Sequence, residues 1–94
     1  LVTQLVRVNC FIHDKDWRRV EEDLDRIAPH LDQIGLYDSD IASSAKLSAV
    51  ACEEVGQPEL ARKAWQIVHS QLTALGRHEE ANEAKGKLEI TAQA

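Results

Sequence analysis

Apolar residues recur every three or four positions along most of the chain, which is the spacing of one face of an α-helix. In the segment 17–34 they follow a 3,4,3,4,3 spacing, through Trp17, Val20, Leu24, Ile27, Leu31 and Ile34. Pro29 lies inside this segment, but the stripe keeps its phase across it. The pattern therefore predicts one helix that is bent at Pro29 and ended by Gly35.

Weaker patterns predict four further helices. Residues 1–12 have helical spacing, although their β-branched residues would also suit a strand. A third helix, at about 41–55, is rich in small residues that let neighbouring helices pack closely, so we expect it to be the inner helix. A fourth begins at Pro58, a residue favoured in the first helical turn. A fifth, at about 77–90, would cap the stack with a short apolar face made of Ala81, Ala84 and Leu88.

Turn residues separate these helices. Side chains that can accept a hydrogen bond from a free backbone N–H precede the second helix, at Asp14 or Asp16, and the third, within 38–40. Gly56 and Gly76 each follow a helical pattern. Glycine adopts the left-handed conformation that ends a helix at little cost, so each of them predicts a helix end.

The helix pairs repeat along the chain. A shift of 41 places superimposes the stripe of the second helix on the fourth and Gly35 on Gly76, whereas a shift of 42 superimposes Val8 on Val50 and Cys10 on Cys52. A repeat of this length built from two helices is typical of a helical solenoid, in which each unit buries its apolar face on the next.

Two segments, 56–61 and 76–81, consist of a glycine followed five residues later by an alanine, with a carboxylate between them. They resemble the turn between the two helices of a tetratricopeptide repeat. In the inner helix, Ala45, Ala49 and Cys52 stand where that family places its packing residues. HEAT-type and armadillo-type repeats have periods of about 40 to 47 residues and remain alternatives.

The resemblance implies an all-α fold of about five helices, with antiparallel pairs stacked as a right-handed superhelix. The expected organisation is a single domain, 1–94, with repeat one at 1–35, repeat two at 36–76 and a capping helix at 77–92. Because the apolar start at Leu1 would expose an unpaired helix face, we expect the domain to be part of a longer array.

In this family the first helix of each pair lines a concave surface that holds a peptide or a helix of a partner protein. The resemblance therefore implies a partner-binding surface made of Gln4, Val8, Phe11, Ser43, Lys46, Val50 and Glu53. Lys46 could meet a carboxylate of the partner. An equally open alternative is that Val8, Phe11 and Val50 are core residues packed against another repeat.

The expected function is accordingly that of a protein-interaction module, or scaffold, and not of an enzyme. One alternative is a homo-oligomerisation element, in which two copies form a homodimer through the first helix. Another is a regulatory domain that senses a small ligand or peptide and is attached to a further domain.

Charge and composition limit the classes of partner and the cellular compartment that we expect. The net charge is −5 and the eleven basic residues are scattered, which argues against nucleic acid as a partner. No apolar run is long enough to span a bilayer, so no membrane association is expected. Two cysteines without a CxxC pair favour a reducing compartment, and we expect a cytoplasmic location.

Candidate chemistry is sparse. No cofactor is expected and no catalytic residue is assigned, because the sequence has no glycine-rich phosphate loop and no nucleophile elbow. Cys10 and His13 lie one helical turn apart, but Cys52 has no such histidine, so small buried cysteines explain the pair better than a metal site. The acidic run 21–25 beside Arg18, Arg19 and Arg26 predicts ion pairs on a solvated helix face.

Overall fold

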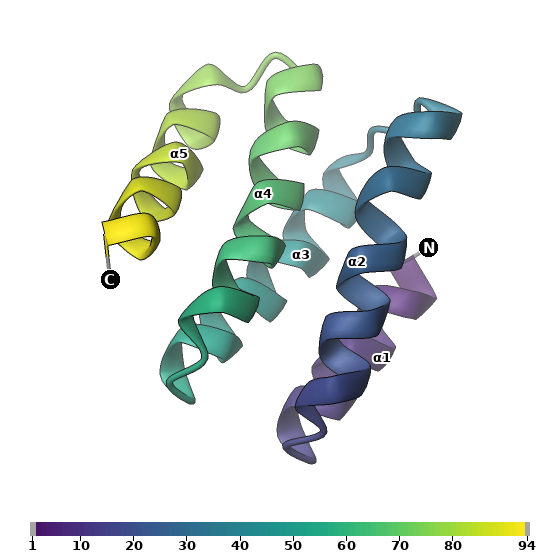
Figure 1. Cartoon of the computed structure of the whole chain (residues 1–94). Helices are drawn as coiled ribbons and strands as arrows, with labels where there is room; N and C mark the ends of the chain where they lie inside the picture. Colours follow the sequence, from purple (N-terminus) through teal and green to yellow (C-terminus); the bar gives the residue numbers. More distant parts are fainter. Residues whose placement is uncertain (1, 94) are drawn as a thin grey trace.

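Five α-helices make up most of residues 2–93, the part of the chain that the computed structural model describes; side chains are described for residues 7–89. Short turns join the helices, so that consecutive helices run antiparallel (Figure 1). In chain order they are α1 (Val2–His13), α2 (Trp17–Ile34), α3 (Ser39–Glu54), α4 (Pro58–Ala74) and α5 (His78–Gln93). The all-helical prediction is confirmed for the described residues, and Val2–His13 forms a helix and not a strand.

Local chemistry sets the helix ends as the sequence predicts. The Asp16 carboxylate accepts a hydrogen bond from the Arg19 backbone N–H at 3.4 Å and caps α2. The Asp38 carboxylate caps α3 by accepting from the Asp40 N–H at 2.7 Å. Pro58 occupies the first turn of α4, where its missing N–H costs no helical bond. Helix α2 continues across Pro29, which confirms that this segment is one helix.

The turns after α1 and α3 have the same hydrogen bonds at corresponding positions. Asp16 N–H donates to the Phe11 carbonyl after α1, and Gln57 N–H donates to the Cys52 carbonyl after α3, both at 2.9 Å. In each turn the residue before this donor has a left-handed backbone: Lys15 with φ 59° and Gly56 with φ 76°. The two turns are therefore related by a shift of 41 positions.

The turns after α2 and α4 are related by the same shift. Leu36 N–H donates to the Leu31 carbonyl at 3.2 Å, and Arg77 N–H donates to the Leu72 carbonyl at 3.0 Å. One register of 41 thus relates both turns of the first helix pair to those of the second. The shift of 42 expected for the first helix is wrong at its C-terminal end, and Cys10 corresponds there to Ala51, not to Cys52.

The helices form two layers. Figure 1 shows α2 and α4 side by side in front, with α1 and α3 behind them, and α5 beside α4 at the end of the stack. Helix α3 packs against both α1 and α4, but α4 contacts three helices, α2, α3 and α5, so these contacts do not single out α3 as the inner helix. The core between the layers contains four members of the α2 stripe and five apolar residues predicted for α4: Val20, Leu24, Ile27, Leu31, Ala61, Ala64, Trp65, Val68 and Leu72.

Two predicted stripe residues lie outside this core. Ile34 is 52% exposed and Leu75 is 36% exposed, although both are in phase with the buried residues of their helices. Ile34 is the last residue of α2 and Leu75 directly follows the last residue of α4, so both lie at a helix end. Ala81 and Ala84 are buried and Leu88 packs partly against the core, so α5 packs along α4 and caps the end of the stack as predicted.

Candidate functional site

Helix α3 has one buried face and one exposed face. Its buried face consists of small residues and one isoleucine: Ile41, Ala42, Ala45, Ser48, Ala49 and Cys52. On the opposite side lies a set of exposed residues that we call the α3 outer face: Ser43, Lys46, Leu47, Val50 and Glu54. Leu47 is 65% exposed and Val50 is 37% exposed, so this helix presents apolar side chains to solvent in its middle.

An open hollow of about 640 Å³ lies beside this face, between α1 and α3. We call it the α1–α3 groove. Its α3 wall includes Leu47 and Val55, two of the more exposed apolar residues of the described chain. Its full lining is Asn9, Ile12, His13 and Lys15 from the α1 side and Leu47, Ala51, Glu54 and Val55 from the α3 side. Its volume is in the range of ordinary ligand and peptide pockets.

A partly buried hydrogen bond joins the two helices that flank the groove. The Ser48 hydroxyl lies 3.0 Å from the Asn9 side-chain oxygen and 3.2 Å from the Ser44 carbonyl, and it can donate to either. Ser48 is fully buried, so its hydroxyl needs a partner inside the protein. The contact fixes α1 against α3, which makes the groove a preformed feature of the fold.

Of the expected binding stripe on the first helix, the structure contradicts Val8 and places Phe11 toward α2. Val8 is fully buried in the core and cannot contact a partner, so for this residue the core alternative holds. Phe11 is half-buried, with the guanidinium groups of Arg7 and Arg19 at 5.9 and 5.4 Å from its ring centre. Because Arg19 belongs to α2, Phe11 faces α2 and not the groove. The Gln4 side chain lies outside the described side chains.

On α3 the expected residues are exposed, but one of them has an internal role. Ser43, Lys46 and Val50 belong to the outer face. The Glu53 carboxylate accepts a hydrogen bond from the Trp65 indole N–H at 2.7 Å, and its other oxygen lies 3.9 Å from Lys87 Nζ. Glu53 therefore links α3 to α4 and α5, which makes it a structural residue in this fold.

The residues that sequence reasoning missed are Leu47 and Val55. The shift of 42 matches Leu47 to Leu5, which makes it look like a repeated core position. Leu47 lies four residues after Ser43 and three before Val50, which places it on the same helix face as these two expected binding residues. This spacing alone predicts that Leu47 is exposed, but the incorrect shift of 42 matched it to a core position instead.

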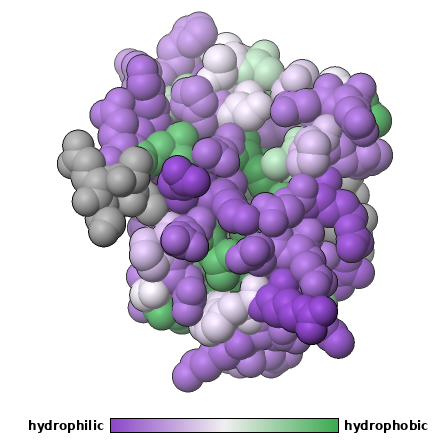
Figure 2. Space-filling model, viewed as in Figure 1, coloured by the Kyte–Doolittle hydropathy of each residue, from purple (hydrophilic) through white to green (hydrophobic). Residues whose placement is uncertain are grey.

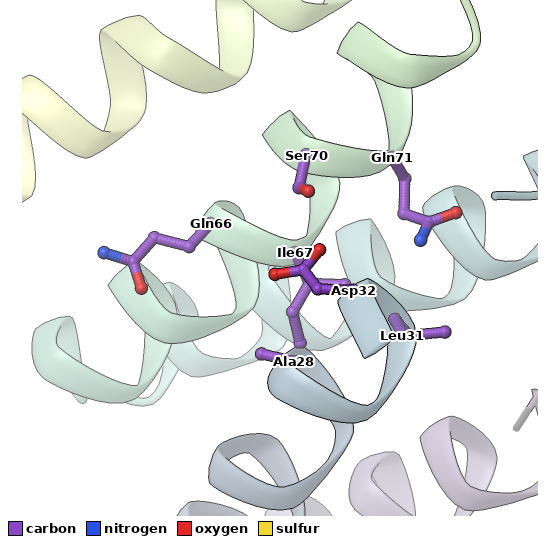
Figure 3. Close-up of a pocket in the computed structure, with 7 residues that line it drawn as sticks. All are labelled: Ala28, Leu31, Asp32, Gln66, Ile67, Ser70 and Gln71. Atoms are coloured by element: carbon purple, nitrogen blue, oxygen red, sulfur yellow. The ribbon is translucent and has the colours of Figure 1, made fainter. Parts of the chain in front are cut away.

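A second hollow, of about 160 Å³, separates α2 from α4. Figure 3 shows its lining: Ala28, Leu31 and Asp32 from α2 and Gln66, Ile67, Ser70 and Gln71 from α4. The buried Gln71 side chain already accepts from the Asp38 N–H at 2.8 Å and donates to the Leu36 carbonyl at 2.9 Å. Its amide therefore holds the loop before α3, and this hollow is a less suitable binding site than the groove.

The opposite side of the molecule is polar. Figure 2 shows the face formed by α2, α4 and α5, where hydrophilic residues predominate and hydrophobic ones show mainly in narrow gaps. The predicted ion pairing is found between Arg18 and Glu22, at 3.2 Å. Asp23 instead turns inward, is buried, and accepts two hydrogen bonds from Arg7 of α1, at 3.2 and 3.3 Å.

The described residues offer neither a metal site nor a membrane span. Among them, no three His, Cys, Asp or Glu side chains lie together as they would around a metal ion.

No helix in the same part of the chain is both long and apolar enough to cross a membrane. Cys10 and Cys52 are both free thiols; Cys10 is exposed, which corrects the expectation that it is a small buried residue, and Cys52 is buried.

Comparison with models of protein families, with curated proteins and with solved structures gave no match in any of the three.

Proposed function

We propose that the chain is a tetratricopeptide-like module, with its helix pairs stacked as a right-handed superhelix, that binds a segment of a partner protein. The binding surface consists of the α3 outer face and the α1–α3 groove. Two observations support the repeat assignment: the turns recur with a shift of 41 positions, and like helices pack on like, α1 on α3 and α2 on α4. The function is to bind, not to catalyse, in a reducing compartment such as the cytoplasm.

The exposure of Leu47 is the observation that carries the proposal. A leucine at 65% exposure in the middle of a helix leaves most of its apolar surface in water. Full burial of such a side chain is worth roughly 1.5 to 3 kcal/mol, so a partner that covers it gains a sizeable part of that free energy. Val50 and Val55 extend the apolar surface along the same side of the molecule toward the groove.

The shape of the surface indicates how a partner segment would bind. Leu47 and Val50 are three residues apart and thus adjacent on the helix, and the groove runs beside them. An amphipathic helix or an extended peptide with one large apolar side chain would insert that side chain into the groove. Lys46 and Glu54 at the ends of the surface would then orient the segment through its charges.

The test is a selection of displayed peptides against the immobilised chain. We expect the selected peptides to carry a large apolar residue and to bind Leu47→Asp at least about tenfold more weakly, because the new carboxylate would be buried under the peptide. The matched control is Ile34→Asp, since Ile34 is similarly exposed but lies at the end of α2, outside the groove. Circular dichroism would verify that both variants stay folded.

Peptides that bind Leu47→Asp as tightly as the unaltered chain would contradict the proposal. Equal weakening by Leu47→Asp and Ile34→Asp would do so as well, because it would place binding elsewhere or show it to be nonspecific.

A further inference from the structure

The α3 outer face carries opposite charges at its two ends with apolar residues between them. Lys46 lies toward one end, Leu47 and Val50 follow, and Glu54 lies at the other end. Lys46 and Glu54 are eight residues apart, or about 12 Å along the helix, which is too far for them to pair with each other. Neither has an ion-pair partner within the described residues. Both charges are thus available to a partner.

This order of charges is complementary to itself when the helix is read in the opposite direction. If two α3 helices lie antiparallel, with a twofold axis beside Val50, Lys46 of each copy faces Glu54 of the other. The apolar residues of the two helices then meet in the middle. An isologous contact of this kind uses the same patch twice and closes after two subunits.

We propose that the partner of the α3 outer face is a second copy of this chain, bound antiparallel through α3; the inference rests on the proposed function of that surface. The contact differs from a homodimer through α1, since Val8 of α1 is fully buried. A uniformly acidic or basic partner would meet its opposite charge at only one end of the face. A second copy meets it at both ends.

Val50 and Leu47 give the contact its apolar centre. In the register that pairs Lys46 with Glu54, Val50 faces Val50, and Leu47 of one copy lies between Val50 and Glu54 of the other. Leu47 also lines the α1–α3 groove, so the hollow of about 640 Å³ adjoins the contact. Both Leu47 side chains are covered at once. Apolar surface that is exposed to water in the monomer is therefore buried in the dimer and stabilises it.

Sedimentation equilibrium on the whole chain tests the arrangement. We expect the unaltered chain to show a monomer–dimer equilibrium, and Lys46→Glu or Glu54→Lys to lower the association constant on the order of 10- to 100-fold each, because each reversal sets two like-charge pairs into the interface. Arg62→Glu is the matched control for Lys46→Glu, because it changes the net charge equally at an exposed position of α4, and it should leave association unchanged.

The decisive sample is an equimolar mixture of Lys46→Glu and Glu54→Lys. In each heterodimer the carboxylate introduced by the first substitution faces the ammonium group introduced by the second. At the other end of the contact, the unaltered Glu54 of the first variant faces the unaltered Lys46 of the second. Both pairs are then attractive, so the mixture should associate about as strongly as the unaltered chain.

Two results would overturn the antiparallel contact. One is a mixture that associates no better than its separate components. The other is single reversals that associate as strongly as the unaltered chain.

The two proposals can fail separately. An unaltered chain that stays monomeric at millimolar concentration, while displayed peptides still bind in a Leu47-dependent way, would overturn the self-association and leave the protein-interaction function standing. Association that survives Leu47→Asp would overturn it too, because the interface would then lie on another surface.

Discussion

Lys15 adopts a left-handed backbone, with φ 59°, at a turn where the second repeat has Gly56 with φ 76°. A residue with a Cβ atom is destabilised by roughly 1 to 2 kcal/mol in this conformation. Glycine avoids this strain, but part of the gain is offset because glycine loses more conformational entropy on folding. We expect Lys15→Gly to raise the free energy of unfolding by about 0.5 to 1 kcal/mol. Urea unfolding followed by circular dichroism would measure it.

Two controls accompany this prediction. Lys15→Ala removes the charge but keeps the Cβ atom, so it should bring no such gain. Gly56→Ala should lower the free energy of unfolding by about 1 kcal/mol, since no neighbouring atom lies within 4 Å of the added Cβ and only the backbone conformation is strained. A destabilised Lys15→Gly would show that the lysine side chain itself supports the turn.

Cys52 gives the fold a dependence on pH. Burial, followed by the nearby charge of Glu53, raises the pKa of its thiol from 9.0 to about 11. A pKa that is higher in the folded chain means that folding favours the neutral thiol, so this contribution to stability is complete below pH 9 and is lost as the pH rises from 9 to about 11. We expect the free energy of unfolding to fall more steeply over that interval in the unaltered chain than in Cys52→Ala.

The comparison with Cys52→Ala separates this effect from the titration of lysine and tyrosine, which both proteins share. Urea unfolding at several pH values from about 8 to about 11 would supply the two slopes. If the free energy of unfolding falls equally steeply with pH in both proteins, the Cys52 thiol has the same pKa in the folded and unfolded chains. That result would contradict the effect expected from its burial in the core.

At the scale of the elements, Gln71 fixes the position of α3 relative to α4. Its amide accepts from Asp38 N–H and donates to the Leu36 carbonyl, and so ties the loop before α3 to a helix more than thirty residues later. Gln71→Leu keeps the bulk but leaves both loop groups without this partner, which should cost about 1 to 3 kcal/mol. Gln66→Leu is the matched control, because Gln66 is exposed on the same helix, and its effect should stay within about 0.5 kcal/mol.

Thermal or urea unfolding of the two variants decides this point. If both variants have the same free energy of unfolding, water replaces the hydrogen bonds of Gln71 at no cost in stability. The position of the loop before α3 would then not depend on Gln71.

The sequence predicts elements well where their causes are local. Asp16, Asp38 and Pro58 act on the first turn of their own helices, and Gly35 on the last, so their roles follow from residue type and position alone. The stripe of α2 is also local, because a 3.6-residue period determines which residues share a face. Ile34 departs from it at the last residue of α2, where its side chain is exposed.

Residues whose role depends on a distant partner could not be assigned in this way. Glu53 meets Trp65 and Lys87, and Gln71 meets the loop before α3. Val8 illustrates the same limit on α1, where a largely apolar sequence leaves the rotation of the helix undefined until α2 and α3 pack on it. The α1 part of the expected binding surface was misplaced for that reason.

At the scale of the whole molecule, the repeat explains the arrangement of the layers. A period of 41 residues brings α3 beside α1 and α4 beside α2, and contacts across the repeats follow: Ser48 with Asn9 in one layer and Lys63 Nζ with Asp25 in the other, the latter at 2.7 Å. The Lys63 to Asp25 pair is exposed and adds little stability. Stability comes mainly from the core between the layers, which leaves α3 free to present its outer face.

The central claim is that the α3 outer face is a protein-binding surface whose partner is a second copy of this chain. Nuclear magnetic resonance spectra of the ¹⁵N-labelled chain, recorded from micromolar to millimolar concentration, test it most directly. The account predicts amide shifts that move with concentration at Leu47, Val50 and Glu54 and remain fixed at Ile34 and Leu75. Shifts that move at Ile34 and Leu75, with α3 unchanged, would contradict it.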